Sequence, residues 1–106
     1  MSNAYRPREA VFRAVADPTR RAILNRLREQ CAAVGDLAQA FPCSRPAISK
    51  HLRILRRARL VTARRQGRRR VYELTPAPLV AIDDWLADYR SHVRSALRRL
   101  KAHLES

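Results

Sequence analysis

The side chains that could act as acids, bases or nucleophiles in this chain are badly spaced for catalysis. Asp83 and Asp84 are adjacent within a segment of helical periodicity, so their carboxylates diverge by about 100° and make a poor acid–base pair. Ser49 and His51 lie two positions apart and diverge as well. With only 2 glycines, the chain can form neither a phosphate-binding P-loop nor a dinucleotide-binding turn. These observations favour a protein that is not an enzyme.

Basic side chains, in contrast, are numerous and concentrated in one part of the chain. The 106 residues include 23 Lys and Arg against 9 Asp and Glu, which gives a formal net charge of +14. A solvated helix face usually mixes both signs, whereas a run of one sign is typical of a surface that binds a polyanion. The charge therefore predicts a nucleic acid partner. From position 37 to position 72 no residue is acidic and eleven are basic: Arg45, Lys50, Arg53, Arg56, Arg57, Arg59, Arg64, Arg65, Arg68, Arg69 and Arg70.

Hydrophobic periodicity and helix-start residues predict four short helices in the first half of the chain. Asp17 and Ser44 are good N-caps, and each is followed by a proline in the first helical turn, where the missing N–H costs nothing. Ile48, Leu52 and Leu55 mark the buried face of the fourth helix, so its opposite face is left to basic and polar residues. The expected ranges are 8–15, 18–29, 36–41 and 44–58.

A hairpin is expected to follow these helices. β-branched and aromatic residues at 61–65 and 70–74 predict two strands. The four residues between the strands include Gly67, which can supply the positive φ that a tight turn needs. The other residues of this tip are one Gln and two Arg, so the tip is strongly basic.

A long helix is expected to end the chain, over residues 78–104. Its apolar positions recur at steps of three and four, as in a coiled coil. At about 1.5 Å per residue such a helix is roughly 40 Å long, which exceeds what the small domain before it could cover. The apolar stripe is therefore expected to pack against a second copy of the chain.

Four runs of sequence carry a family resemblance: AVADPTRRAILNRL, VGDLAQAF, CSRPAISKHLRILRRARLV and RRQGRRRVYELTP. With this order of elements the chain resembles the ArsR/SmtB family of winged helix-turn-helix transcriptional repressors, and the resemblance covers roughly residues 11–76. The resemblance implies one domain over 1–106, mainly α with a small β-hairpin. Its parts would be a recognition helix at 44–58, a two-stranded wing at 61–74 and a C-terminal dimerisation helix at 78–104.

The resemblance also implies which side chains meet DNA. His51 stands at the family's usual histidine, where packing at the helix margin is favoured over a base contact. Arg59 stands where relatives usually have Gly, which weakens the expected helix stop. The residues expected to bind DNA lie on the outer face of the recognition helix and on the wing: Arg45, Pro46, Ser49, Lys50, Arg53, Arg56, Arg65, Arg68 and Arg69.

The cysteines do not match the family's thiolate metal site. In arsenite sensors a Cys-Val-Cys-Asp-Leu sequence opens the third helix, whereas residues 33–37 here read Ala-Val-Gly-Asp-Leu. Both thiolates that would hold a thiophilic ion are missing. Cys31 and Cys43 are therefore expected to be small, unreactive hydrophobes.

The histidines of the last helix match a second metal site of the family only in part. His92 and His103 have the separation of its two histidines, but Arg90 stands in place of the Asp. Glu105 follows His103 by two positions instead of three. An arginine beside a divalent cation is electrostatically unfavourable. The chain therefore resembles members that lack the recognised metal sites, and no metal or cofactor is expected.

These features together predict a homodimeric repressor of transcription. The C-terminal and first helices would form the dimer and set two recognition helices about 34 Å apart on a near-palindromic operator in double-stranded DNA. One alternative is a repressor that responds to a metal or small ligand through Cys31 and Cys43 or through His92 and His103. A second alternative is a basic RNA-binding protein, although few aromatic residues are free to stack on bases.

The distribution of apolar residues indicates where in the cell the protein is expected. No stretch approaches the length of about 18 apolar residues that a membrane span needs, and the first thirty positions lack the apolar core of a signal peptide. With 2 cysteines the chain has too few for a disulfide framework. A cytoplasmic protein without a membrane partner is expected.

Overall fold

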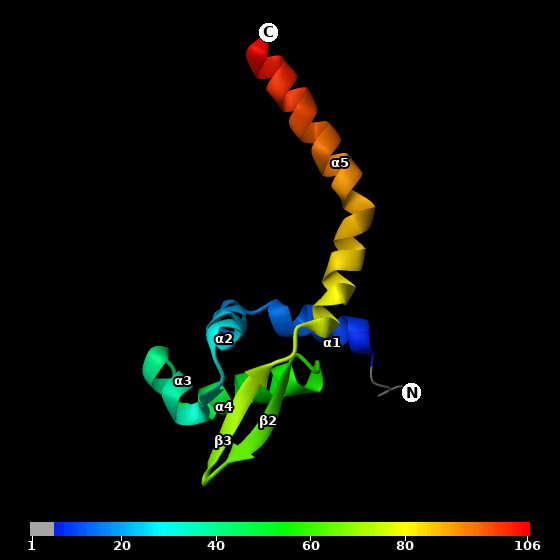
Figure 1. The fold of residues 1–106 in the computed structure, drawn as a ribbon. Helices are drawn as coiled ribbons and strands as arrows, with labels where there is room; N and C mark the ends of the chain where they lie inside the picture. Colours follow the sequence, from blue (N-terminus) through cyan, green and yellow to red (C-terminus); the bar gives the residue numbers. More distant parts are fainter. Residues whose placement is uncertain (1–5) are drawn as a thin grey trace.

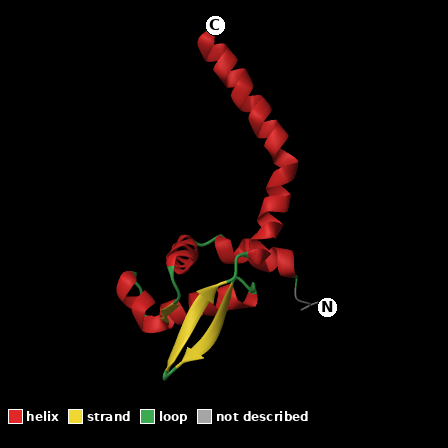
Figure 2. Cartoon of the chain, viewed as in Figure 1, coloured by secondary structure: helices red, strands yellow, loops and turns green. Residues whose placement is uncertain are grey.

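The computed structural model describes residues 6–106, which form a small helical body and one long helix that leaves it (Figures 1 and 2). Residues 1–5 of the expected domain lie outside the described part. None of the described helices is long and apolar enough to cross a membrane. The elements, in order, are α1 (Pro7–Val15), α2 (Pro18–Glu29), β1 (Ala32–Ala33), α3 (Val34–Ala40), α4 (Arg45–Arg57), β2 (Val61–Gln66), β3 (Arg69–Leu74), a 3-10 turn (Ala77–Leu79) and α5 (Val80–Glu105).

Side-chain caps determine where two of the helices begin. The Asp17 carboxylate accepts the Arg20 backbone N–H at 3.0 Å and starts α2. The Ser44 hydroxyl accepts the Ala47 N–H at 3.3 Å and starts α4. Both bonds satisfy a donor that the first helical turn leaves without an intrahelical partner. The helices α2 and α4 therefore begin where the local sequence supplies a capping side chain.

The end of α4 differs from the expectation of a weakened stop. Arg59 takes the left-handed conformation with φ 62°, although it is not glycine. Its N–H donates to the Arg56 carbonyl at 2.9 Å, and the Leu60 N–H donates to the Leu55 carbonyl at 3.0 Å. This is the Schellman arrangement, and Leu60 is fully buried. Burial of that leucine offsets the cost of about 1 kcal/mol for a left-handed non-glycine residue.

The expected hairpin is present, and a third strand that was not expected extends it into a three-stranded sheet. β2 and β3 pair antiparallel from Val61↔Leu74 to Gln66↔Arg69, so the turn has two residues and not four. Gly67 has φ 64° in this turn, as a tight hairpin requires. β1 adds to the other side of β3 and gives the order β1-β3-β2. No local pattern predicts β1, because this strand has only two residues and pairs with residues far along the chain.

The core lies where the helices of the body meet the sheet. Leu37 of α3 and Leu55 of α4 are fully buried, and Val61 and Tyr72 close the core on the sheet side. No buried polar or charged residue is found in the described part of the chain. The three predicted buried positions of α4 belong to this core, which fixes the direction in which the opposite face of the helix points.

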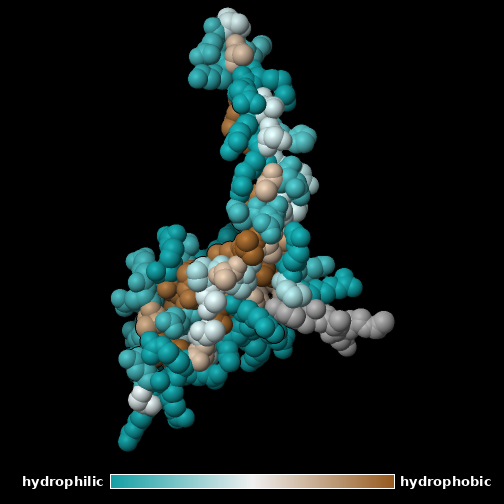
Figure 3. Space-filling model, turned by 45° about the vertical axis from the view of Figure 1, so that its right-hand side comes forward, coloured by the Kyte–Doolittle hydropathy of each residue, from teal (hydrophilic) through white to brown (hydrophobic). Residues whose placement is uncertain are grey.

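The helix α5 projects from the body (Figure 1), and large apolar residues along it are exposed. At the base, the Trp85 ring packs edge-on against Phe12 of α1, with centroids 5.7 Å apart. Figure 3 shows hydrophobic residues where α5 leaves the body. The exposed fractions of these large apolar residues of α5 lie between 42% at Leu86 and 73% at Leu104.

Candidate nucleic-acid interface

The outer face of α4 presents basic side chains to solvent. Because Ile48, Leu52 and Leu55 are buried, the residues between them at helical spacing point outward. Ser49 is half-buried at the margin of this face. The exposed residues of α4 that the sequence assigned to DNA contact are Arg45, Pro46, Lys50, Arg53 and Arg56.

The wing presents a second group of exposed cations. Arg65 and Arg68 are exposed, and Arg68 lies in the two-residue turn at the tip. A hollow of about 310 Å³ is lined by Ala63 and the wing arginines. Because its charged lining is entirely cationic, the hollow favours an anion. Figure 3 shows this end of the body as hydrophilic.

Two of the wing arginines are engaged within the protein. Arg69 donates from Nη2 to the Asp36 carboxylate at 2.6 Å, and Asp36 belongs to α3. Arg64 lies 3.5 Å from the Glu73 carboxylate on the neighbouring strand. Sequence reasoning placed Arg69 among the DNA contacts and did not predict its ion pair with Asp36. The available signal was that Asp36 is the last acidic residue before the acid-free stretch.

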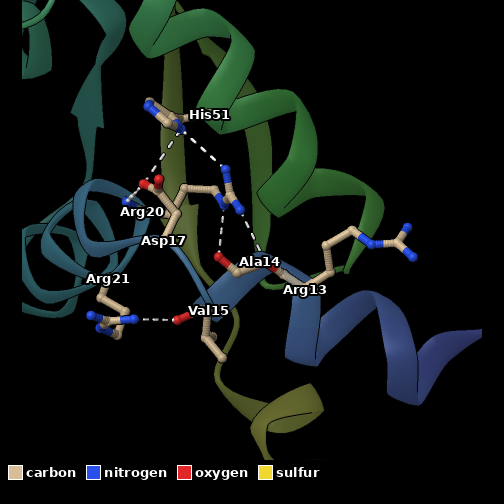
Figure 4. A network of polar contacts seen from close by, with 7 residues as sticks. All are labelled: Arg13, Ala14, Val15, Asp17, Arg20, Arg21 and His51. Atoms are coloured by element: carbon tan, nitrogen blue, oxygen red, sulfur yellow. Dashed lines mark hydrogen bonds and ion pairs between the residues drawn. The ribbon is translucent and has the colours of Figure 1, made fainter.

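His51 lies at the inner margin of α4 in a polar network (Figure 4). Its Nδ1 is 3.4 Å from an Arg20 guanidinium nitrogen and 3.9 Å from the Asp17 carboxylate. Arg20 also donates to the Ala14 carbonyl at 2.7 Å and to the Arg13 carbonyl at 3.0 Å. Arg20 therefore links the end of α1, the start of α2 and α4. The structure places His51 against the body rather than on the outer face, and sequence reasoning missed Arg20.

Two carboxylates of the body have lowered pKa values. The Arg20 backbone N–H is the main cause of the lowered pKa of Asp17, and charges on Arg20 and His51 contribute. The Ala33 backbone N–H is the main cause of the lowered pKa of Asp36, followed by the hydrogen bond from Arg69. Both groups are acceptors of bonds that favour their ionised form.

The candidate metal ligands do not form a cluster in the part of the chain that the structure describes. Cys31 and Cys43 are half-buried free thiols, and Cys31 Sγ lies 3.6 Å from an Arg64 guanidinium nitrogen. His92 and His103 are exposed on α5. Among residues 6–106 there is no group of three or more His, Cys, Asp or Glu side chains that could hold a metal ion. The geometry thus offers a cationic surface on α4 and the wing as the candidate site.

Comparison with known proteins gives the family. Residues 17–63 match the family described as bacterial regulatory protein, arsR family. Over 80 residues the chain is 50% identical to the HTH-type transcriptional regulator Rv2034 of Mycobacterium tuberculosis, which covers 76% of this chain and 75% of that protein. The chain belongs to the ArsR family. The transcriptional repressor SdpR of Bacillus subtilis is 38% identical over 79 residues, 74% of this chain and 88% of the relative.

Solved ArsR structures share the fold. An ArsR-like transcriptional regulator from Rhodococcus sp. RHA1 superposes with a TM-score of 0.70 at 31% identity, covering 91% of each chain. An ArsR family transcriptional regulator matches with a TM-score of 0.74 at 34% identity, covering 84% of this chain and 98% of that one. The expected winged helix-turn-helix fold is confirmed. As an ArsR-family member the chain is a DNA-binding transcriptional regulator and not an enzyme.

Proposed function

We propose that the protein is a homodimeric repressor that binds a near-palindromic operator through the outer face of α4 and the wing. The observation that carries this proposal is the charge of one segment. From position 37 to position 72 the chain has eleven Lys and Arg residues and no Asp or Glu. These cations lie on the exposed part of α4 and on the hairpin beside it, except for Arg59, which lies between α4 and β2.

The helix α4 and the wing would make different kinds of contact with DNA. Arg53 and Ser49 on α4 are placed to meet base edges in the major groove, where hydrogen-bond patterns differ between base pairs. Arg65 and Arg68 on the wing meet the flanking minor groove or the phosphates, and narrow A·T-rich segments favour such arginines. Phosphate contacts fix the register of the protein, and base contacts select the sequence.

The exposed stripe of α5 supports a dimer. Tyr89, Val93, Leu97 and Leu100 are each 50% to 59% exposed, and soluble monomers rarely present so extended an apolar surface. A two-fold interface formed by α5 and helped by α1 would cover this stripe. It would place two copies of α4 about 34 Å apart, so the operator would carry two half-sites about one helical turn apart. A dimer on a promoter blocks the polymerase.

The test is selection of bound duplexes from a random pool with the purified protein, followed by footprinting of the enriched sequence. We expect a near-palindrome with half-sites separated by about ten base pairs, and protection of both. Enrichment of an asymmetric site, or no enrichment of any duplex over a matched single-stranded RNA competitor, would contradict the proposal.

A further inference from the structure

The first turn of α3 lies between the two elements assigned to DNA. From α4, the Arg45 guanidinium lies beside Gly35. A Cβ atom on this glycine would be 3.5 Å from the Nη2 atom of Arg45, which is van der Waals contact. From the wing, the Arg69 guanidinium donates to the Asp36 carboxylate at 2.6 Å. Side chains from the recognition helix and from the wing thus converge on two consecutive residues, of which Asp36 carries a negative charge.

Asp36 is itself held in place by the backbone. The Oδ2 atom that receives Arg69 also accepts the Ala33 N–H at 3.2 Å. Ala33 belongs to β1 and pairs with Val71 of β3, the strand that begins at Arg69. The carboxylate is therefore anchored to the same sheet that carries the wing. Its lowered pKa, caused first by the Ala33 N–H and then by Arg69, keeps it ionised at neutral pH.

We propose that Asp36 is a positioning residue that holds Arg69 against α3 and thereby withholds one phosphate contact from the wing. The neighbouring Arg68 makes no hydrogen bond or ion pair within residues 6–106, so its guanidinium is available to DNA. A backbone phosphate that takes Arg69 must compete with the carboxylate. The inference rests on the proposed DNA-binding surface and refines the role of one of its members.

The exposure of the pair makes this competition possible. The Arg69 side chain is 60% exposed and the Asp36 side chain 46% exposed, so the ion pair is open to water and to a ligand. Exposed ion pairs contribute little to stability. A phosphate contact carries no sequence information. Asp36 therefore lowers the affinity of the wing for every duplex alike.

The test compares Arg68→Gln with Arg69→Gln, which remove the same charge from adjacent wing positions. Binding of the full chain to a random-sequence duplex is measured by fluorescence anisotropy between about 50 and 200 mM salt. Loss of one phosphate contact changes the slope of log affinity against log salt by about 0.9 per protomer. We expect this full change for Arg68→Gln and a clearly smaller one for Arg69→Gln.

The variant Asp36→Asn supplies the second arm. The asparagine oxygen can still accept the Ala33 N–H, while the charge that holds Arg69 is gone. We expect tighter binding to the random duplex and a slope steeper by about 0.9 per protomer. In this background Arg69→Gln and Arg68→Gln should reduce the slope equally. Glu105→Gln, at the far end of α5, adds the same net charge and should leave the slope unchanged.

Failure of the inference about Asp36 can be distinguished from failure of the proposed DNA-binding surface. Equal slope changes for Arg68→Gln and Arg69→Gln in the otherwise unchanged protein would overturn the inference, and this comparison does not depend on the folding of Asp36→Asn. An Asp36→Asn protein that melts like the parent but has an unchanged or shallower slope would overturn it too. If the parent protein itself binds duplex DNA without salt dependence, the proposed surface is wrong.

Discussion

At the scale of the residue, side chains with the same charge have different environments. Arg53 is exposed on α4, and Arg69 is paired with Asp36. Arg20, a half-buried residue of α2, contacts residues of α1 and α4. Charge alone therefore does not identify a DNA contact. The position of each guanidinium relative to a carboxylate or a backbone carbonyl decides whether it is available to a phosphate or a base.

Arg53→Ala tests the base-reading role. We expect it to weaken operator binding by about 1 to 3 kcal/mol and to relax the preference at one position in each half-site, because a bidentate contact with a base edge is lost. Repeating the selection from random duplexes measures the preference. Lys101→Ala, distant from α4 on α5, removes the same charge as a control. A uniform loss of affinity with unchanged preference would assign Arg53 to phosphate.

The lowered pKa values of Asp17 and Asp36 predict how stability depends on pH. A carboxyl whose folded pKa lies below its ordinary value of 3.8 stabilises the protein above that value. The stabilisation is lost as pH falls through the folded pKa. We expect Asp17→Asn to be less stable than the parent at pH 7 and the difference to shrink below about pH 3.8, measured by urea unfolding. A difference that is independent of pH would contradict this account.

At the scale of the element, local chemistry was predictable and distant pairing was not. The caps Asp17 and Ser44 could be identified because each bonds an N–H three residues away. The strand β1 could not, because Ala32 and Ala33 pair with Tyr72 and Val71, about forty positions further along the chain.

The other features that were not predicted also depend on contacts between elements and not on the local sequence. The end of α4 near Ala58 was predicted, whereas the left-handed conformation of Arg59 and the burial of Leu60 after it depend on tertiary packing. The composition of the cationic surface followed from sequence. The pairing of Arg69 with Asp36, 33 positions away, depends on tertiary structure.

The exposed stripe of α5 predicts the behaviour of a charge placed on it. Leu97 is 59% exposed, so Leu97→Asp should leave the body folded, while a carboxylate buried in a two-fold interface is costly. We expect a monomer in analytical ultracentrifugation and weakened binding to the full operator. Arg94→Asp, also exposed on α5, introduces the same side chain outside the stripe. Dimers that persist in Leu97→Asp would place the interface elsewhere.

At the scale of the whole molecule, the charge divides the chain into functional parts. The net charge of +14 comes chiefly from the eleven cations between positions 37 and 72, and the remaining segments carry twelve basic and nine acidic residues. The near-neutral segments form the other helices of the body and α5, and the cationic segment forms α4 and most of the wing, whose apolar side chains complete the core. This separation leaves α5 nearly neutral in net charge, as the proposed pairing of two copies through α5 would require.

The salt dependence of duplex binding tests whether α4 and the wing form one DNA-binding surface. If the dimer contacts about six to ten phosphates, its affinity should fall roughly 10³-fold to 10⁵-fold between about 50 and 200 mM salt. The measurement is an anisotropy titration of labelled duplex at several salt concentrations. A log–log slope that corresponds to this number of phosphates is the predicted result. A nearly flat response would contradict the claim that α4 and the wing form one surface for duplex DNA.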